Sequence, residues 1–266
     1  MKDHALSLVG RAYPGQGKNV LREYLQARVL ETLQREKATR ALVFQGGTAL
    51  RFLHDIPRYS EDLDFTLEGD VTAYDPRGWL KAIERQFQRE GYEVRVSLRQ
   101  RGLVHGGWLR FAGLLWEAGL SQQRAENLAI KMEVDTNPPA GAFTETGTCR
   151  RHVTVRLRHH DRASLLAGKL AAILCRPYTK GRDVYDLGWY LADRRWPPPN
   201  LHLLNSALRQ AMPAVSTLTE DTWRPAMARR VEDMSWEHVR ADVSPFLEGP
   251  QTLLTREELL ALLRPA

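Results

Sequence analysis

The stretch FQGGTALRFLHDIPRYSEDLDF, residues 44–65, decides how this chain folds. The apolar run that leads into it predicts a buried strand ending at a glycine pair, Gly46 and Gly47. Apolar positions after Thr48 predict a short helix, which must stop before Pro57. The alternating residues that follow, DLDFTLE, predict a second strand. A glycine turn and a pair of acids are therefore expected close together in an otherwise apolar setting.

Two carboxylates of this stretch point to one face of the second strand. Residues two apart on a strand share a face, so Asp62 and Asp64 project together while Leu63 and Phe65 face the core. Like charges at this separation repel unless a cation lies between them. Mg²⁺ or Mn²⁺, held by one or two carboxylates and by substrate phosphates, satisfies this requirement. A solvated polar strand face is the alternative.

The glycine pair before the short helix predicts an anion site. Glycine lets a phosphate approach the backbone, and a helix start offers free N–H groups and the positive end of the helix dipole. The Thr48 hydroxyl is placed to cap the helix or to donate to a phosphate oxygen. Taken alone, the pair is also consistent with a tight packing turn. Beside the two acids, it predicts a triphosphate cradle next to a metal pair, as phosphoryl chemistry requires.

The pattern of predicted secondary structure changes at Asp161. Before it, helical and strand-like segments mix, and after it the pattern is helical, with Asp161 as an N-cap and WPPPN (196–200) as a linker. We therefore expect a mixed domain over 1–160 and an all-helical domain over 161–266. The segments that predict helices in the first domain are 19–36 and 75–92, and those that predict strands are 92–100, 106–118, 127–137 and 150–158.

Composition restricts the class of protein. With 43% hydrophobic and 26% charged residues the chain is globular rather than disordered. The formal net charge of +6 favours a polyanionic partner, although a merely basic protein has the same balance. Two cysteines cannot build a disulfide framework or a zinc site alone. No signal peptide or membrane span is evident, so we expect a cytoplasmic protein without a membrane partner.

The opening stretch resembles the first motif of the DNA polymerase β-type nucleotidyltransferase superfamily. That motif has a glycine pair, a short helix and two alternating acids. The lead-in RYSEDLDF further resembles the AbiEii/AbiGii toxin branch, which includes the mycobacterial MenT toxins. The residues that match are Gly46, Gly47, Arg58, Ser60, Asp62 and Asp64, with Thr48 directly after the glycines.

Two later segments extend the resemblance, which runs from about residue 41 to residue 191. Lys169 in LLAGKLAAIL matches the lysine of the branch, and Arg182, Asp183 and Asp186 in KGRDVYDLGWYL match a later segment. From the residues alone, a lysine among apolar neighbours either reaches the surface or meets an anion. Asp183 and Asp186 share a helix face and are placed to pair with Lys169 or to reach the active site. Asp183 also lies near a helix start, where an acid is favoured.

The resemblance implies an α+β fold. Its core is a polymerase β-type nucleotidyltransferase domain, a mixed sheet flanked by helices, and its C-terminal domain is all-helical and contributes Lys169 and Asp183 to the active-site cleft. The implied catalytic residues are Asp62, Asp64, Lys169 and Asp183, and the implied nucleotide contacts come from Gly46, Gly47, Thr48, Arg58, Ser60 and Lys169.

A third metal-binding carboxylate is expected on a neighbouring strand. AIKMEVDTNPP offers Glu133 and Asp135 on one face. Asp135 is preferred because it lies at the strand end, so the predicted metal ligands are Asp62, Asp64 and Asp135. The alternative is a charged, solvent-facing ladder of both acids with Lys131.

The resemblance implies a metal-dependent nucleotidyltransferase that uses an NTP and acts as the toxin of a toxin–antitoxin pair, with an antitoxin as partner. The basic run RRHVTVRLRHH (150–160), expected as a strand, suggests an RNA acceptor, and some relatives extend the tRNA 3′ end. Two alternatives stay open at this stage. One is transfer to a small molecule or a protein, and the other is a nucleotide-binding inhibitor without turnover.

Overall fold

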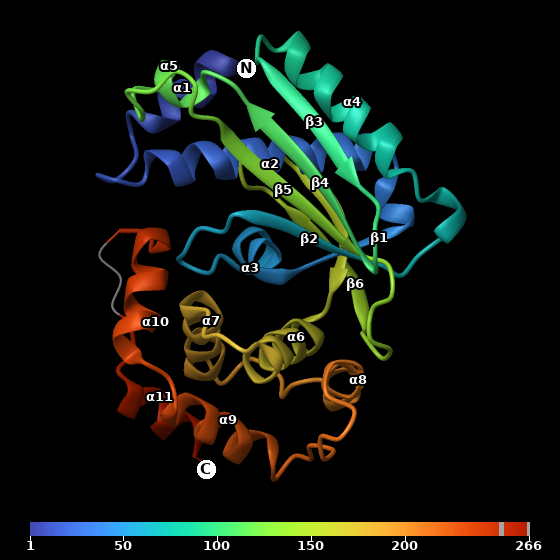
Figure 1. Ribbon diagram of the computed structural model, residues 1–266, viewed down its shortest axis with the longest axis vertical. Helices are drawn as coiled ribbons and strands as arrows, with labels where there is room; N and C mark the ends of the chain where they lie inside the picture. The colour runs from blue at the N-terminus through green and yellow to red at the C-terminus, as the bar shows by residue number, and fades with distance from the viewer. Residues whose placement is uncertain (250–252, 265–266) are drawn as a thin grey trace. The chain divides into compact units, whose positions relative to one another are not determined.

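The strands form one seven-stranded mixed sheet (Figure 1). The computed structural model describes residues 1–249 and 253–264. The strands lie in the order β3-β4-β5-β2-β1-β7-β6, with β2 parallel to β5, β1 parallel to β7, and the β1–β2, β3–β4 and β4–β5 pairs antiparallel. Their bounds are β1 Leu42–Gln45, β2 Asp62–Leu67, β3 Val94–Arg99, β4 Val104–Phe111, β5 Leu128–Asp135, β6 Thr144–Cys149 and β7 Val155–His160.

The chain divides into two compact units, residues 1–138 with 146–159, and residues 139–145 with 160–266. The second unit therefore includes a short segment, 139–145, that the sequence boundary at residue 160 had placed in the first domain. Hydrogen bonds explain this assignment. The Asn200 side chain donates to the Gly141 carbonyl at 2.7 Å, and the Phe143 N–H donates to Ser164 Oγ at 3.0 Å.

Three helices of the first unit pack against the sheet. α2 (Gly17–Arg35) is buried almost all round over residues 21–33 and passes behind the strands in Figure 1. α4 (Pro76–Arg89) is amphipathic, packs on β3, and has the proline at its start that the sequence predicts. α3 (Gly46–His54) contacts β1 and β2. The remaining short helices are α1 (Lys2–Val9), η1 (Ala38–Arg40), η2 (Val71–Ala73) and α5 (Leu114–Glu117).

The second unit is helical outside its 139–145 segment and the end of β7, as the sequence predicts. Asp161 caps α6 (Arg162–Cys175) by accepting the Ser164 N–H at 2.8 Å, which confirms the predicted cap. The WPPPN stretch is packed rather than free, because the Trp196 ring lies edge-on to Tyr190 with centroids 4.3 Å apart. The other helices are α7 (Gly181–Ala192), α8 (Leu201–Ala211), α9 (Trp223–Glu232), α10 (Trp236–Val243), η3 (Ser244–Phe246) and α11 (Arg256–Leu263).

Two local predictions are wrong, and one strand, β6, was not predicted. The run expected as a strand over 106–118 leaves the sheet after Phe111, because Gly113 has a φ of 67° and starts α5. The run 150–158 is a turn until β7 begins at Val155. β6, with the sequence TETGTC, lacks the apolar alternation by which a strand is recognised.

Both cysteines are free thiols, so the structure contains no disulfide framework, as the sequence predicts. Within residues 1–249 and 253–264, none of the helices has the length and apolar character that crossing a membrane requires.

Candidate active site

The turn at the end of β1 passes directly against an acid of β2. Gln45 pairs with Asp64 across the two antiparallel strands, so the next residue, Gly46, lies beside the Asp64 side chain. A β-carbon on Gly46 would lie 3.0 Å from Cβ and Cγ of Asp64 and closer still to Oδ2, and Gly46 has a φ of 76°. Only glycine accepts both conditions without strain.

The second glycine lies against the Arg-x-Ser lead-in. A β-carbon on Gly47 would lie 2.7 Å from Arg58 Nη2 and 3.0 Å from Ser60 Oγ. The Arg58 guanidinium is 1% exposed, and its Nη1 donates to the Tyr59 carbonyl at 2.9 Å. The fold thus gathers the glycine pair, Arg58, Ser60 and Asp64, which sequence alone could only place in order along the chain.

Thr48 is buried, and its hydroxyl donates to the backbone carbonyl of Asp62. α3 begins at Gly46 rather than near Thr48, with Gln45 at the N-cap and no capping side chain. The prediction that Thr48 caps the helix is therefore wrong. Its hydroxyl ties α3 to β2, and the expected contact of Thr48 with a phosphate stays a prediction. The backbone N–H groups at the helix start have no partner within the helix.

The two predicted metal-binding acids share a face of β2. Asp62 and Asp64 are half-buried, whereas Leu63 and Phe65 are buried, which confirms the alternation. Both acids are hard oxygen ligands of the kind that Mg²⁺ prefers, and they lie beside the glycine turn. In the part of the chain that the structure describes, no group of three or more His, Cys, Asp or Glu residues is arranged to hold a metal. Two carboxylates match the one or two by which Mg²⁺ is usually held in proteins, together with substrate phosphates and water.

The strand register favours Glu133 over Asp135 as a neighbour of this pair. In the parallel β2–β5 ladder, Asp64 lies beside Glu133, whereas Asp135 lies beside Thr66, about 7 Å further along the strand. The preference for Asp135 as a metal ligand, which rested on its place at the strand end, stays a prediction, and the register offers Glu133 as the alternative. Burial raises the pKa of Asp135, and the charge of Glu68 adds to this effect.

The alternative predicted for this face is present in part. Lys131 pairs with Glu133 at 2.6 Å, so the two form the expected charged ladder beside Asp62 and Asp64. The N–H of Asn137 donates to Asp135 Oδ1 at 2.9 Å, which places this acid in a local turn.

A buried ion cluster surrounds Lys169 in the helical unit. Its Nζ lies 2.9 Å from Asp183 Oδ1 and 2.8 Å from Asp186 Oδ2, and Arg176 also pairs with Asp183. Lys169 is therefore paired with both acids rather than extended into solvent, as one of the two sequence interpretations predicts. Burial alone would raise the pKa of Asp183, but the charges of Lys169 and Arg176 outweigh it and lower the pKa to about 2. Arg182 instead lies over the Phe246 ring, 4.0 Å from its centroid.

The basic run does not form one continuous stripe. Arg151 lies in the turn before β7 and pairs with Asp55 at 2.5 Å and with Glu23 at 3.4 Å. On β7 the expected alternation holds, with Arg156 exposed between buried apolar residues. Arg150 in the turn is also exposed.

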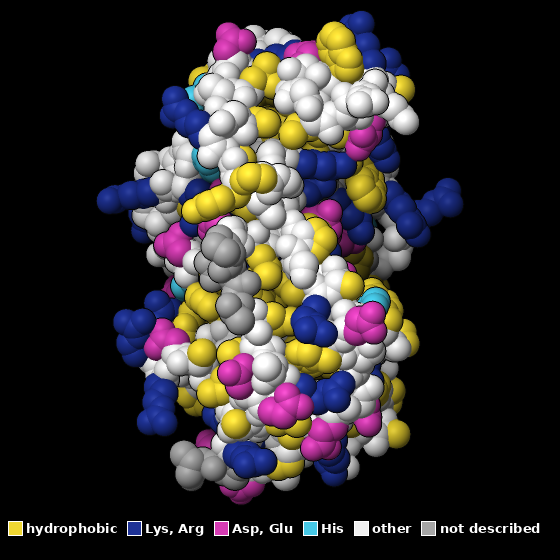
Figure 2. All heavy atoms as spheres, turned by 90° about the vertical axis from the view of Figure 1, so that its left-hand side faces the viewer, with side chains coloured by type: hydrophobic (Ala, Val, Ile, Leu, Met, Phe, Trp, Pro, Cys, Tyr) yellow, Lys and Arg dark blue, Asp and Glu magenta, His cyan; other side chains and the backbone are white. Residues whose placement is uncertain are grey.

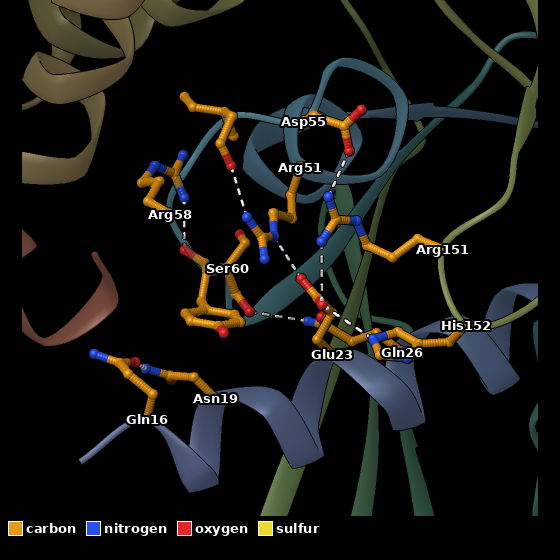
Figure 3. Close-up of polar contacts among 12 residues, drawn as sticks. Gln16, Asn19, Glu23, Gln26, Arg51, Asp55, Arg58, Ser60, Arg151 and His152 are labelled. Atoms are coloured by element: carbon orange, nitrogen blue, oxygen red, sulfur yellow. Dashed lines mark hydrogen bonds and ion pairs between the residues drawn. The ribbon is translucent and has the colours of Figure 1, made fainter. Parts of the chain in front are cut away.

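Sequence reasoning missed a polar network beside the Arg-x-Ser segment (Figure 3). Glu23 and Gln26 of α2 and Arg51 of α3 are 5%, 0% and 1% exposed. Burial would raise the pKa of Glu23, but the hydrogen bond from His152 and the charge of Arg51 lower it to about 2. A signal was available in principle, since polar residues on the buried face of a helix need partners.

Comparisons with known proteins identify the family and the fold. A family model described as the nucleotidyl transferase AbiEii toxin of a type IV toxin–antitoxin system matches residues 28–261. The fold is similar to JHP933 from Helicobacter pylori, with 16% identity, a TM-score of 0.53, and 92% of this chain and 90% of that chain covered. It is also similar to a candidate nucleotidyltransferase from H. pylori, with 17% identity, a TM-score of 0.54 and 91% of each chain covered. No curated protein matches the chain.

Replacing Gly46 with alanine tests the close approach to Asp64. Gly102 is a matched control because it has nearly the same φ, 77°, with nothing within 4 Å of an added β-carbon. Both alanine variants should lose about 1 kcal/mol from left-handed backbone strain. Gly46→Ala should lose clearly more in urea unfolding because it also displaces the Asp64 carboxylate. Equal losses in the two variants would refute the close approach.

Acid should weaken the Lys169 cluster in a defined pH window. Because the folded pKa of Asp183 is lowered to about 2 from 3.8, the unfolded chain binds more protons between these values. The contribution of Asp183, about 2 kcal/mol, is complete above pH 4 and is lost as the pH falls towards 2. Asp183→Asn should flatten the loss of urea stability below pH 4, with Asp221→Asn, an exposed acid, as control. An unchanged profile in Asp183→Asn would contradict the assignment.

Proposed function

This chain belongs to the family of AbiEii nucleotidyl transferase toxins of type IV toxin–antitoxin systems, and from this premise we propose that it transfers a nucleotide from an NTP to an acceptor with Mg²⁺ or Mn²⁺. The family implies an antitoxin partner. The single observation that supports the site most directly is the close approach of the Gly46–Gly47 turn to Asp64, Arg58 and Ser60.

Each group of this site has a part in the proposed transfer. The N–H groups at the start of α3 and the positive end of its dipole bind the triphosphate, and the two glycines let this turn lie close to Asp64, Arg58 and Ser60. Asp62 and Asp64 hold the metal, and Glu133 is the nearest further carboxylate by register. The metal, when bound, offsets the negative charge of the phosphates. Arg58 supplies a buried cation next to Gly47.

Lys169 and Asp183 are included in the proposed site because they match the sequence motif of the family. The ion pairs of Lys169 with Asp183 and Asp186 show that its charge is already compensated within the helical unit. Removing Lys169 would leave two buried carboxylates without their main partner, which costs about 3–5 kcal/mol. Lys169→Ala should therefore lower the melting temperature as well as the activity.

The proposed acceptor is RNA, in particular the tRNA 3′ end. The chain carries a net charge of +6, and on the face drawn in Figure 2 Lys and Arg side chains stand out in several separate groups with acids among them. Arg150 and Arg156 are the exposed cations of the basic run, and they support a contact with an RNA backbone. A small-molecule or protein acceptor is the second candidate, because the Lys and Arg groups on the face drawn in Figure 2 are separate rather than continuous.

Labelling tests the transfer and its acids together. Wild-type protein, each α-³²P-labelled NTP, Mg²⁺ and total RNA should yield labelled RNA. Asp62→Asn and Asp64→Asn should reduce labelling at least 100-fold while the melting temperature is nearly unchanged, because both side chains are half-buried at the edge of the core. Glu93→Gln, which removes an exposed acid of the same unit, is the control.

Three outcomes of this labelling experiment separate the alternatives. Label in a small molecule or a protein would replace the RNA acceptor by the second candidate. NTP binding without any labelled product would support the remaining alternative, a nucleotide-binding inhibitor that carries out no turnover. Full activity in either asparagine variant would refute the metal-site assignment.

Charge reversal tests the RNA contact. Arg150→Glu with Arg156→Glu should weaken RNA binding, and the slope of log affinity against log salt should fall by about 1 for each phosphate that the variant no longer neutralises. NTP binding should be unchanged, since it depends on the glycine turn. Arg95→Glu with Arg99→Glu, two exposed arginines on the edge strand β3, is the matched control. Equal weakening in both pairs would indicate a general charge effect and would count against a specific role of Arg150 and Arg156.

A further inference from the structure

The segment between α3 and β2, residues 55–61, carries Arg58 and Ser60 but has no regular helix or strand. It runs through the protein, with Ile56, Arg58 and Tyr59 buried. The backbone carbonyls of such a segment must find hydrogen-bond donors outside a ladder. Their donors are largely side chains.

Two arginines hold the first half of the segment. Arg51 Nη1 of α3 donates to the Ile56 carbonyl at 3.0 Å, and Arg58 Nη1 donates to the Tyr59 carbonyl at 2.9 Å. The Arg51 guanidinium also lies over the Tyr59 ring, 4.7 Å from its centroid. The backbone on either side of Arg58 is therefore fixed by charged donors.

A single amide holds the second half. Gln26 Nε2 of α2 donates to the Ser60 carbonyl at 3.2 Å and to the Glu61 carbonyl at 2.8 Å, and the next carbonyl, that of Asp62, accepts from Thr48. Gln26 is completely buried. Its two bonds end where β2 and its metal-binding acids begin.

Glu23 keeps Arg51 in place one helical turn before Gln26. Its Oε2 accepts from Arg51 Nε at 2.5 Å, and its Oε1 accepts from His152 at 3.0 Å (Figure 3). Glu23 is 5% exposed, and its carboxylate forms a buried ion pair with the Arg51 guanidinium. Glu23 and Gln26 thus point from one face of α2 towards the same segment.

We propose that Gln26 and Glu23 are positioning residues of the nucleotidyl transfer. Gln26 acts directly on the Ser60–Glu61 backbone, and Glu23 acts through Arg51 on Ile56. Together they hold Arg58 and Ser60 against Gly47 and set the entry of β2, and hence the direction of Asp62 and Asp64. The inference rests on the proposed function. It adds to the proposed site two residues, Glu23 and Gln26, that are not among the proposed ligands of the nucleotide or the metal.

Gln26→Met tests the inference because it keeps the length of the side chain and removes the donor. Thr32→Val is the matched control. Thr32 is 3% exposed on the same helix, and its hydroxyl donates to the Arg28 carbonyl at 3.0 Å, so this variant loses a buried hydrogen bond that does not reach the segment. Three quantities are measured in each protein: the melting temperature, amide hydrogen exchange over residues 55–66, and kcat and KM for transfer with Mg²⁺ and NTP.

The two variants should lower the melting temperature to a similar degree but differ in the other readouts. Gln26→Met should exchange faster over 55–66 and should lose about 100-fold in kcat at saturating NTP, because a small misplacement of reacting groups is costly. Thr32→Val should retain wild-type kcat and exchange. Glu23→Gln should show the same pattern as Gln26→Met, extended to the backbone near Ile56. If Gln26→Met does not fold, Gln26→Asn, one methylene shorter, replaces it with the same expectation.

The result that overturns the inference is a Gln26→Met or Gln26→Asn protein with the kcat, KM and segment exchange of Thr32→Val. This differs from failure of the proposed function, in which the wild-type protein itself transfers no nucleotide from any NTP to any acceptor. An active wild type with an unaffected Gln26 variant therefore rejects only the positioning roles.

Discussion

The contact between the Gly46 turn and the Asp64 side chain is the constraint on which the site depends. It requires β1 and β2 to be antiparallel neighbours in one register, with Gln45 opposite Asp64. It also requires a residue without a β-carbon at a φ of 76°. The same turn then places the start of α3, and its unsatisfied N–H groups, next to a carboxylate. The start of a helix and a carboxylate therefore lie side by side, which is the arrangement on which the proposed triphosphate and metal site rests.

Hydrogen bonds from side chains hold the rest of the motif, residues 55–61, in place beside this turn. In a regular strand the ladder would hold the backbone, but residues 55–61 lie outside the sheet. Buried donors from α2 and α3 take the place of the ladder, and each such group is costly if its partner is removed. The site is therefore supported by a helix, α2, that carries none of the motif residues. This explains why α2 is polar on a buried face where packing alone would favour apolar residues.

Local chemistry was predictable from sequence, whereas pairing across elements was not. Period-two alternation identified the shared face of Asp62 and Asp64, and the helical cap at Asp161 followed from residue type. The choice between Glu133 and Asp135 depended on the register of two parallel strands, which nothing in either strand specifies. β6 was missed because its polar residues lack a burial pattern, although its neighbour β7 has one. Glu23 and Gln26 belong to the same class, since their partners lie more than twenty residues away.

The two buried ion clusters, one around Asp183 and one around Glu23, keep a buried carboxylate ionised in the same way. They differ in how they contact the motif residues. In each, a carboxylate has its pKa lowered to about 2 despite burial. The charges of Lys169 and Arg176 do this for Asp183, and the hydrogen bond from His152 and the charge of Arg51 do it for Glu23. A buried pair contributes little net stability over an apolar substitute, yet removal of one partner is expensive. Such pairs therefore fix the orientation of side chains more than they stabilise the fold. Glu23 orients Arg51, and Arg51 donates to the backbone near Arg58. For Lys169 the pairing fixes the ammonium between two helices of its own unit, α6 and α7, so any phosphate bound there would compete with Asp183 and Asp186 for the same three donors.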